Sequence, residues 1–172
     1  MSTAKPRVGA PVTPTSFPAV SGGEISIGDT KDRWTMLFVY RGKHCPKCKT
    51  YLNILNGMLD QWTDAGFDVA VTSADPEERA SADQAEFGWH FPLAYGLTED
   101  QMATLGLFVS EPLSETENDR RFAEPGVYVL RPDGSMLLVA ISNGPAARPD
   151  LATLLDGMIF TKDNDRPPRG TA

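Results

Sequence analysis

The sequence is poor in cysteine, histidine and clustered basic residues, and it lacks a long apolar run. It contains two cysteines and two histidines in 172 residues, with 16 Lys and Arg against 23 Asp and Glu, for a formal net charge of −7. No window approaches the roughly 18 consecutive apolar residues that a membrane-spanning helix needs. No run of Lys and Arg is dense enough to form a stripe against phosphate. We therefore expect neither membrane insertion nor a nucleic-acid partner.

The N-terminal residues show no apolar stretch of signal-peptide length before a cleavage pattern, so we expect a cytoplasmic protein. Hydrophobic residues make up 41% and charged residues 23% of the chain, as in ordinary globular proteins. The length favours one domain with a full core over two domains. We expect an extended arm over residues 1–15, a single domain over residues 16–162 and an irregular tail over residues 163–172.

The apolar pattern predicts alternating strands and helices. Residues 34–40 and 67–74 are apolar on both faces, which is typical of strands at the centre of a sheet. Alternation of strands and helices favours parallel pairing, and a late hairpin adds antiparallel strands, so we predict an α/β fold with a mixed sheet flanked by helices. The other expected elements are an N-terminal hairpin over 16–29, helices from the cysteines to Gly66, over 75–87, over 98–106 and from 151 to 159, and a hairpin of strands 126–130 and 135–141.

The two cysteines stand three residues apart in Cys45-Pro46-Lys47-Cys48, directly after the first central strand. If a helix begins near Pro46, Cys45 lies at its N-terminus, where unpaired N–H groups and the helix dipole favour a thiolate. Cys48 lies one turn further, within reach of a mixed disulfide or sulfenic acid formed on Cys45. We predict that Cys45 attacks and Cys48 resolves. Pro46 costs little at a helix start and fixes the backbone beside Cys45.

A metal site is the alternative interpretation of the same residues. A closed zinc site takes four ligands, and the chain offers only His44 and His90 besides the cysteines. His44 adjoins Cys45, which makes chelation of one ion by both awkward, whereas a protonated His44 could stabilise the Cys45 thiolate. Arg41 is a further candidate for that role. We expect no metal and no cofactor, but a non-catalytic metal-binding or redox-sensing module stays open.

Five stretches resemble the thioredoxin-fold peroxiredoxin-like proteins, known as the AhpC/TSA or redoxin family, in the branch with C-P-x-C. They are VGAPV (8–12), LFVYRGKHCPKCKTYL (37–52), VTSADPEE (71–78), FPLAYGLTEDQMATLGL (91–107) and FAEPGVYVLRPDG (122–134). The resemblance implies a thioredoxin-like fold, with Cys45 as the attacking cysteine and Cys48 as the second. It also matches Pro125 to the family's proline beside the active site, which implies a cis Glu124–Pro125 bond.

The chain departs from the peroxide-specialised members of that family. Those proteins carry Pro and Thr or Ser seven and three residues before the attacking cysteine, where this chain has Phe38 and Gly42. Their peroxide-binding arginine would fall near Pro125, so Arg41, Arg121 or Arg148 would have to replace it. The residues therefore favour thiol/disulfide exchange, with a dedicated thiol peroxidase as the close alternative.

Several points about partners follow from this hypothesis. The reductant is expected to be a dithiol donor protein such as a thioredoxin, or a small thiol, and the substrate a peroxide or a disulfide. A homodimer remains open. The polar residues 109–124 are expected to leave the core, and SNGPAARPDL (142–151) is expected to shape the loop into the last helix.

Overall fold

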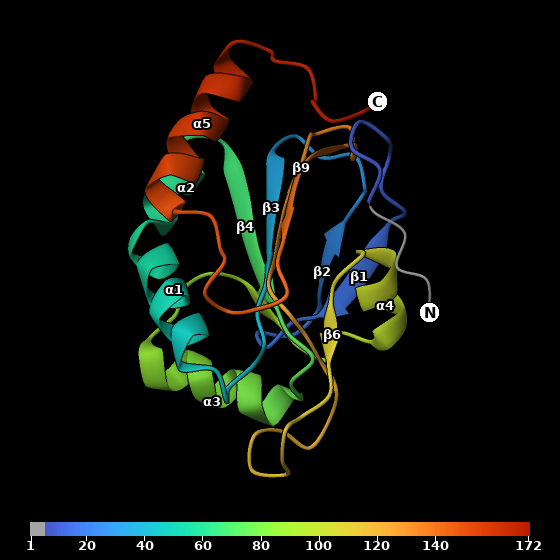
Figure 1. Ribbon diagram of the computed structural model, residues 1–172. Helices are drawn as coiled ribbons and strands as arrows, with labels where there is room; N and C mark the ends of the chain where they lie inside the picture. The colour runs from blue at the N-terminus through green and yellow to red at the C-terminus, as the bar shows by residue number, and fades with distance from the viewer. Residues whose placement is uncertain (1–5) are drawn as a thin grey trace.

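The computed structural model describes residues 6–172 and is built on a five-stranded mixed sheet (Figure 1). Its strand order is β5-β4-β3-β8-β9, with β3 parallel to β4, β4 parallel to β5, β3 antiparallel to β8, and β8 antiparallel to β9. The predicted α/β fold with a mixed sheet is confirmed. The strands are β3 (Trp34–Val39), β4 (Phe67–Thr72), β5 (Leu93–Ala94), β8 (Gly126–Leu130) and β9 (Met136–Ile141).

Helices and small sheets cover both faces of this sheet. In Figure 1, α1, α2 and α5 lie on one side, and α4 lies on the other side together with two short antiparallel sheets, β1–β2 and β6–β7. The helices are α1 (Pro46–Gly57), α2 (Leu59–Asp64), α3 (Glu77–Phe87), α4 (Glu99–Thr104) and α5 (Leu151–Asp163). The short strands are β1 (Thr15–Pro18), β2 (Glu24–Ile27), β6 (Val109–Ser110) and β7 (Phe122–Ala123).

The central strand β3 is apolar throughout because both of its faces are buried. Met36 and Phe38 belong to the core under α1, α2 and α5, whereas Leu37 and Val39 belong to the core under α4 and the N-terminal hairpin. Since successive side chains of a strand point to opposite faces, one strand supplies both cores. This double burial fixes β3 in the middle of the sheet and places the loop after it at the sheet's carboxyl edge.

Two predicted helices differ from the structure at their ends. The helix expected to run to Gly66 is two helices, α1 and α2, with a non-helical Met58 between them. The helix expected from residue 75 begins at Glu77, because Asp75 does not serve as its cap and Pro76 takes the N-cap position. The helix expected over residues 98–106 is α4, and Thr98 and Gln101 form a capping box at its start. The exceptions show that local patterns located the helices but not every terminus.

The predicted domain boundaries are not tested and stay predictions. The structure gives Thr15 as the start of β1 and Asp163 as the end of α5. Residues 1–5 of the predicted arm lie outside the described residues. Further along the arm, the Gly9 N–H donates a hydrogen bond to the Met136 carbonyl at 2.7 Å, which joins the arm to β9. Within residues 6–172 no helix has both the length and the apolar composition for crossing a bilayer.

Candidate active site

Cys45 caps the N-terminus of α1. Strand β3 ends at Val39, a short loop follows, and Pro46 opens the helix with Cys45 in an extended conformation at the N-cap. The Cys45 Sγ accepts a hydrogen bond from the Cys48 N–H at 3.3 Å. This bond satisfies one of the amides that a helix start leaves without an intrahelical partner. The sequence placed Cys45 and Pro46 at these positions, and the structure confirms the placement.

The two cysteines are reduced, buried and unequal in acidity. Cys45 is 1% exposed and Cys48 is fully buried. Hydrogen bonding from the Cys48 side chain lowers the pKa of Cys45 to about 6 against the opposing effect of burial, with help from the Cys48 N–H and the Arg41 guanidinium. Burial, and then the hydrogen bond to Cys45, raises the pKa of Cys48. These opposite shifts favour the thiolate on Cys45 and the proton on Cys48.

Arg41 is the cationic residue next to the Cys45 thiolate. Its Nε lies 3.2 Å from Glu124 Oε2 and its Nη2 lies 3.4 Å from Glu117 Oε1. The guanidinium stands over the Phe122 ring, 4.8 Å from its centroid. Hydrogen bonding from the Arg41 side chain also helps to lower the pKa of Cys45, and the supporting role predicted for Arg41 stays a prediction. Arg121, the second arginine considered from the sequence, pairs at the surface with Glu99 and Glu111 instead.

His44 lies close to the motif but in surroundings that oppose its protonation. Its ring packs against Phe122 with centroids 4.6 Å apart, and Nδ1 lies 3.3 Å from the Asn118 amide nitrogen. Burial, reinforced by the positive charge of Arg41, lowers the pKa of His44. The neutral ring carries no charge, so the expected stabilisation of Cys45 by an imidazolium lacks support here.

Residues 111–121, which we call the cover segment, lie against the cysteine loop. The sequence predicted that residues 109–124 leave the core. The two ends of that range instead pair as β6 and β7, and residues 122–124 are buried, so the excursion is confined to residues 111–121. Glu117 reaches Arg41, and Asn118 reaches His44. Arg79 of α3 holds the same segment through Asn118 at 2.8 Å and Asp119 at 2.9 Å. The cover segment therefore shields the Arg41 side of the site.

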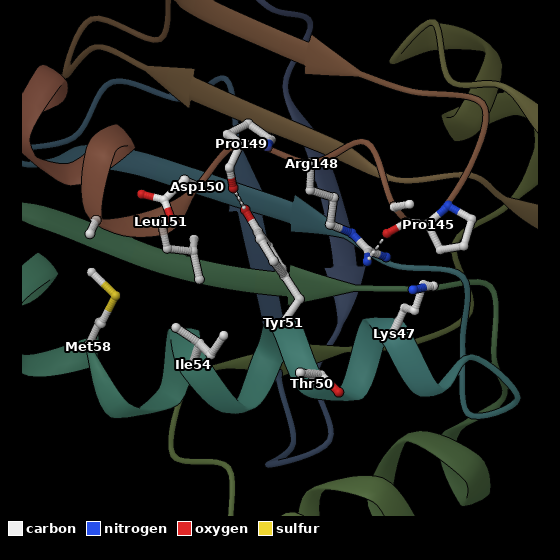
Figure 2. A pocket seen from close by; sticks show the side chains of 12 residues that line it. Lys47, Thr50, Tyr51, Ile54, Met58, Pro145, Arg148, Pro149, Asp150 and Leu151 are labelled. Atoms are coloured by element: carbon white, nitrogen blue, oxygen red, sulfur yellow. Dashed lines mark hydrogen bonds between the residues drawn. The ribbon is translucent and has the colours of Figure 1, made fainter.

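A groove of about 550 Å³ opens on the other side of the motif, between α1 and residues 145–152 (Figure 2). The Tyr51 hydroxyl donates to the Pro149 carbonyl at 2.8 Å and ties the loop to the helix. Arg148 lines this groove and donates from Nη2 to the Cys48 Sγ at 2.6 Å. From the sequence, Arg148 was considered as a replacement for the peroxide-binding arginine, and nothing in its turn-rich stretch indicated a contact with Cys48.

The arrangement of side chains does not support the alternative interpretation of the cysteines and His44 as a metal site. Among residues 6–172, no three Cys, His, Asp or Glu side chains are grouped so that they could hold a metal ion. His44 faces Asn118 and Phe122.

Comparison with known proteins decides the family. The sequence profile of the AhpC/TSA family matches residues 8–138. The chain belongs to the AhpC/TSA family. No curated protein matches this AhpC/TSA chain, but solved peroxiredoxin structures share its fold. Membership of this family supports a thiol redox function.

The fold extends over nearly all of each structural relative. A peroxiredoxin-like protein from Aquifex aeolicus has a TM-score of 0.75 at 16% identity, covering 90% of this chain and 86% of its own. Peroxidoxin BcpB from Mycobacterium tuberculosis has a TM-score of 0.72 at 15% identity, covering 94% and 99%. Mycobacterium tuberculosis AhpC has a TM-score of 0.76 at 13% identity, covering 95% and 96%. At these identities the likeness shows the thioredoxin-like peroxiredoxin fold of the AhpC/TSA chain.

The Glu124–Pro125 bond of this AhpC/TSA protein is trans, and the predicted cis bond is wrong. Residues 6–172 contain no cis peptide bond. Glu124 N–H donates to the Phe108 carbonyl at 2.8 Å, and Ser142 N–H donates to the Pro125 carbonyl at 3.1 Å. These bonds continue the extended path from β7 into β8, so the trans isomer, intrinsically favoured by about 0.5–1 kcal/mol, is retained.

Gly42 replaces the hydroxyl residue of peroxide-specialised relatives for a structural reason. Its φ of +123° lies in the region that side-chain-bearing residues avoid, and a Cβ there would stand 2.8 Å from both Asp75 carboxylate oxygens. The buried Asp75 accepts the Lys43 N–H at 2.6 Å, which holds its carboxylate against Gly42. The AhpC/TSA chain therefore places a carboxylate where a hydroxyl side chain at position 42 would need room.

We expect Gly42→Ser to destabilise the protein by more than about 1 kcal/mol, because it adds both backbone strain and a clash with Asp75. Urea unfolding measured by circular dichroism tests this. Gly57→Ala is the matched control, since Gly57 ends α1 with nothing within 4 Å of an added Cβ. The control is expected to keep or slightly raise stability. Equal stability of Gly42→Ser and wild type would contradict the need for glycine.

Proposed function

We propose that this protein is a thiol/disulfide oxidoreductase in which Cys45 is the nucleophile and Cys48 the resolving thiol. The observation that carries the proposal is the position of Cys45 at the N-cap of α1, where its buried sulfur accepts a hydrogen bond from the Cys48 N–H at 3.3 Å. Cys45, at the helix N-cap, has its pKa lowered to about 6 by Cys48 and Arg41, while the pKa of Cys48 is raised. A sulfur that is ionised at pH 7 beside one that is protonated assigns attack to the first.

The reaction proceeds by two exchanges. The Cys45 thiolate attacks one sulfur of a substrate disulfide, forming a mixed disulfide and releasing the other sulfur as a thiolate. Cys48 then loses its proton and attacks the Cys45 Sγ, which forms the 45–48 disulfide and releases the second substrate thiolate. A dithiol donor such as a thioredoxin, or a small thiol, reverses these steps on the enzyme in a reducing compartment such as the cytoplasm.

The surroundings of position 42 support a disulfide over a peroxide as substrate. Gly42 provides no hydroxyl, and the Asp75 carboxylate occupies the adjacent space. Burial raises the pKa of Asp75, while the Lys43 N–H favours its ionised form. Exchange between sulfurs requires the activated pair and an approach to it, and it does not require a hydroxyl donor to the oxidant.

A dedicated hydroperoxide reductase using the same pair is the second candidate, and two observations favour it. The Arg41 guanidinium lowers the pKa of Cys45 by hydrogen bonding and by its positive charge. A peroxide-binding arginine acts on the attacking cysteine in the same two ways. Cys45 is also 1% exposed, which admits a small oxidant more easily than a protein disulfide. A bulky substrate would require the cover segment to move.

Stopped-flow oxidation separates the two candidates. Reduced protein is mixed with hydrogen peroxide or with hydroxyethyl disulfide, and tryptophan fluorescence is followed, since Trp89 belongs to the same core as both cysteines. We expect peroxide to react at about the rate of a free cysteine thiolate, and the disulfide to react much faster than it does with a free thiol. Mass spectrometry checks that a 45–48 disulfide forms. Peroxide rates several orders of magnitude above those of free thiolate would overturn the proposal in favour of the peroxidase.

A further inference from the structure

Arg148 is fixed against the sulfur of Cys48 by three contacts. The residue belongs to the loop of residues 142–150 between β9 and α5. Its Nη2 donates to Cys48 Sγ at 2.6 Å, and its Nη1 donates to the Pro145 carbonyl at 2.7 Å, the bond drawn in Figure 2. Its guanidinium also stands over the Tyr51 ring, 5.1 Å from the centroid. The loop, the carbonyl and the ring therefore aim one N–H of the guanidinium at the sulfur.

The charge of Arg148 is not neutralised by a carboxylate. Within residues 6–172, no Asp or Glu oxygen lies at ion-pair distance from its guanidinium, although Arg41, Arg79 and Arg121 all have such partners. A partly buried cation without an anionic partner interacts strongly with the nearest group that can become negative. At this position that group is the fully buried Cys48 thiol.

We propose that Arg148 is a catalytic residue that stabilises Cys48 as a thiolate in the step that closes the 45–48 disulfide and in the step that reopens it. This inference rests on the proposed function, in which Cys48 resolves a mixed disulfide on Cys45. It assigns the two arginines of the site to different sulfurs. Arg41 serves Cys45 from the side of the cover segment, and Arg148 serves Cys48 from the side of the groove.

The need for such a residue changes during the reaction. In the resting pair, burial first, and then the hydrogen bond to Cys45 and the negative charge of Cys45, raise the pKa of Cys48 and keep its proton in place. When Cys45 enters a mixed disulfide, that charge disappears and Cys48 must give up its proton to the solvent. Its electron pair then forms the bond to Cys45 Sγ, and the bond from Cys45 to the substrate sulfur breaks. Arg148 already faces the sulfur on which the charge develops, so this step needs no rearrangement of the site.

The same contact assists reduction of the oxidised enzyme. The donor thiolate attacks Cys45 Sγ, the 45–48 bond breaks, and Cys48 leaves with the electron pair as a thiolate. A leaving thiol of lower pKa departs faster. The guanidinium that stabilises Cys48 in the forward step therefore also stabilises it as the leaving group.

Titration of the Cys48 thiolate in a Cys45→Ser background tests the contact directly. Absorbance of the thiolate near 240 nm is recorded against pH, with the serine hydroxyl replacing Cys45 without its charge. Arg148→Gln is expected to raise the titration midpoint by at least one pH unit, because the cation is lost from a buried sulfur. Arg148→Lys is expected to give a smaller rise, since it keeps the charge but loses the planar fork. Arg121→Gln, which alters a surface arginine, is the matched control and should leave the midpoint unchanged.

The outcomes are decisive in either direction. An unchanged midpoint in Arg148→Gln overturns the inference, and if that variant fails to fold, an unchanged midpoint in Arg148→Met, which also removes the charge but keeps a long side chain, does so. In protein that retains Cys45, Arg148→Gln should also lengthen the lifetime of the mixed disulfide by at least about tenfold. If no mixed disulfide forms in wild type, the proposed function fails, while the titration still reports on Arg148 by itself.

Discussion

Replacing Cys48 with serine is expected to make the protein accumulate a stable mixed disulfide at Cys45, and replacing Cys45 is expected to slow exchange at pH 7 by at least about a hundredfold. The structure gives a cause for each effect. With a pKa of about 6, Cys45 is mostly thiolate at pH 7, whereas the raised pKa of Cys48 leaves at most about three per cent of that thiol ionised. Cys48 is also fully buried under Arg148 and the first turn of α1.

Incubation of each reduced variant with hydroxyethyl disulfide, followed by intact mass and peptide mapping, measures both effects. Serine is chosen at position 48 because its hydroxyl can still donate to the Cys45 sulfur. A Cys45→Ser protein that reacts as fast as wild type, with the adduct on Cys48, would reverse the assignment of nucleophile and resolving thiol. Loss of reaction in both variants would instead show that neither sulfur acts alone.

The parts of the site that the sequence predicted depend on contacts within a few residues. The run WTMLFVY identified β3 because a strand with two buried faces must be apolar at every position. The same local reasoning placed Cys45 before the first helical residue, since Pro46 is tolerated at a helix start and a thiolate is favoured there. Both inferences used only residues that are neighbours in the sequence, so neither required knowledge of contacts between distant parts of the chain.

The parts that the sequence did not predict depend on residues far apart in the chain. Cys48 and Arg148 are separated by 100 positions, and a lone arginine in a turn-rich loop does not indicate which group it contacts. Asp75 has the sequence context of a helix cap, but its carboxylate receives the Lys43 N–H 32 residues away, and Pro76 takes the cap. Such side chains have several local uses, and tertiary packing selects among them.

Position 42 combines both situations. The absence of a hydroxyl was readable from the sequence, and it separated this chain from the peroxide-specialised pattern. The cause was not readable, because it lies in a positive φ and in a buried carboxylate contributed after β4. The trans Glu124–Pro125 bond is a similar case. The cis form was expected from the family resemblance, but the isomer of this bond depends on the hydrogen bonds of the flanking backbone, which the sequence does not show.

The stability of the reduced protein is expected to rise with pH between about 6 and 8.5, by up to about 1.4 kcal/mol per pH unit and about 3 kcal/mol in total. The sign follows from proton binding. The Cys45 pKa is about 6 in the folded protein and about 8.5 in an unfolded chain, so between these values the unfolded state binds one more proton. This stabilisation is fully present above the unfolded pKa and is lost as the pH falls through the folded pKa.

Cys48 contributes with the opposite sign at higher pH. Its folded pKa is raised, so above about 8.5 the unfolded state loses a proton that the folded state keeps, and stability falls again. Urea unfolding under strong reductant at pH 5.5, 7, 8.5 and 9.5 measures the profile. The difference between wild type and Cys45→Ser cancels the titration of His44 and Asp75, which also have shifted pKa values. A difference that does not change with pH would show that Cys45 is not ionised preferentially in the folded protein, and the assignment of Cys45 as nucleophile would lose its physical basis.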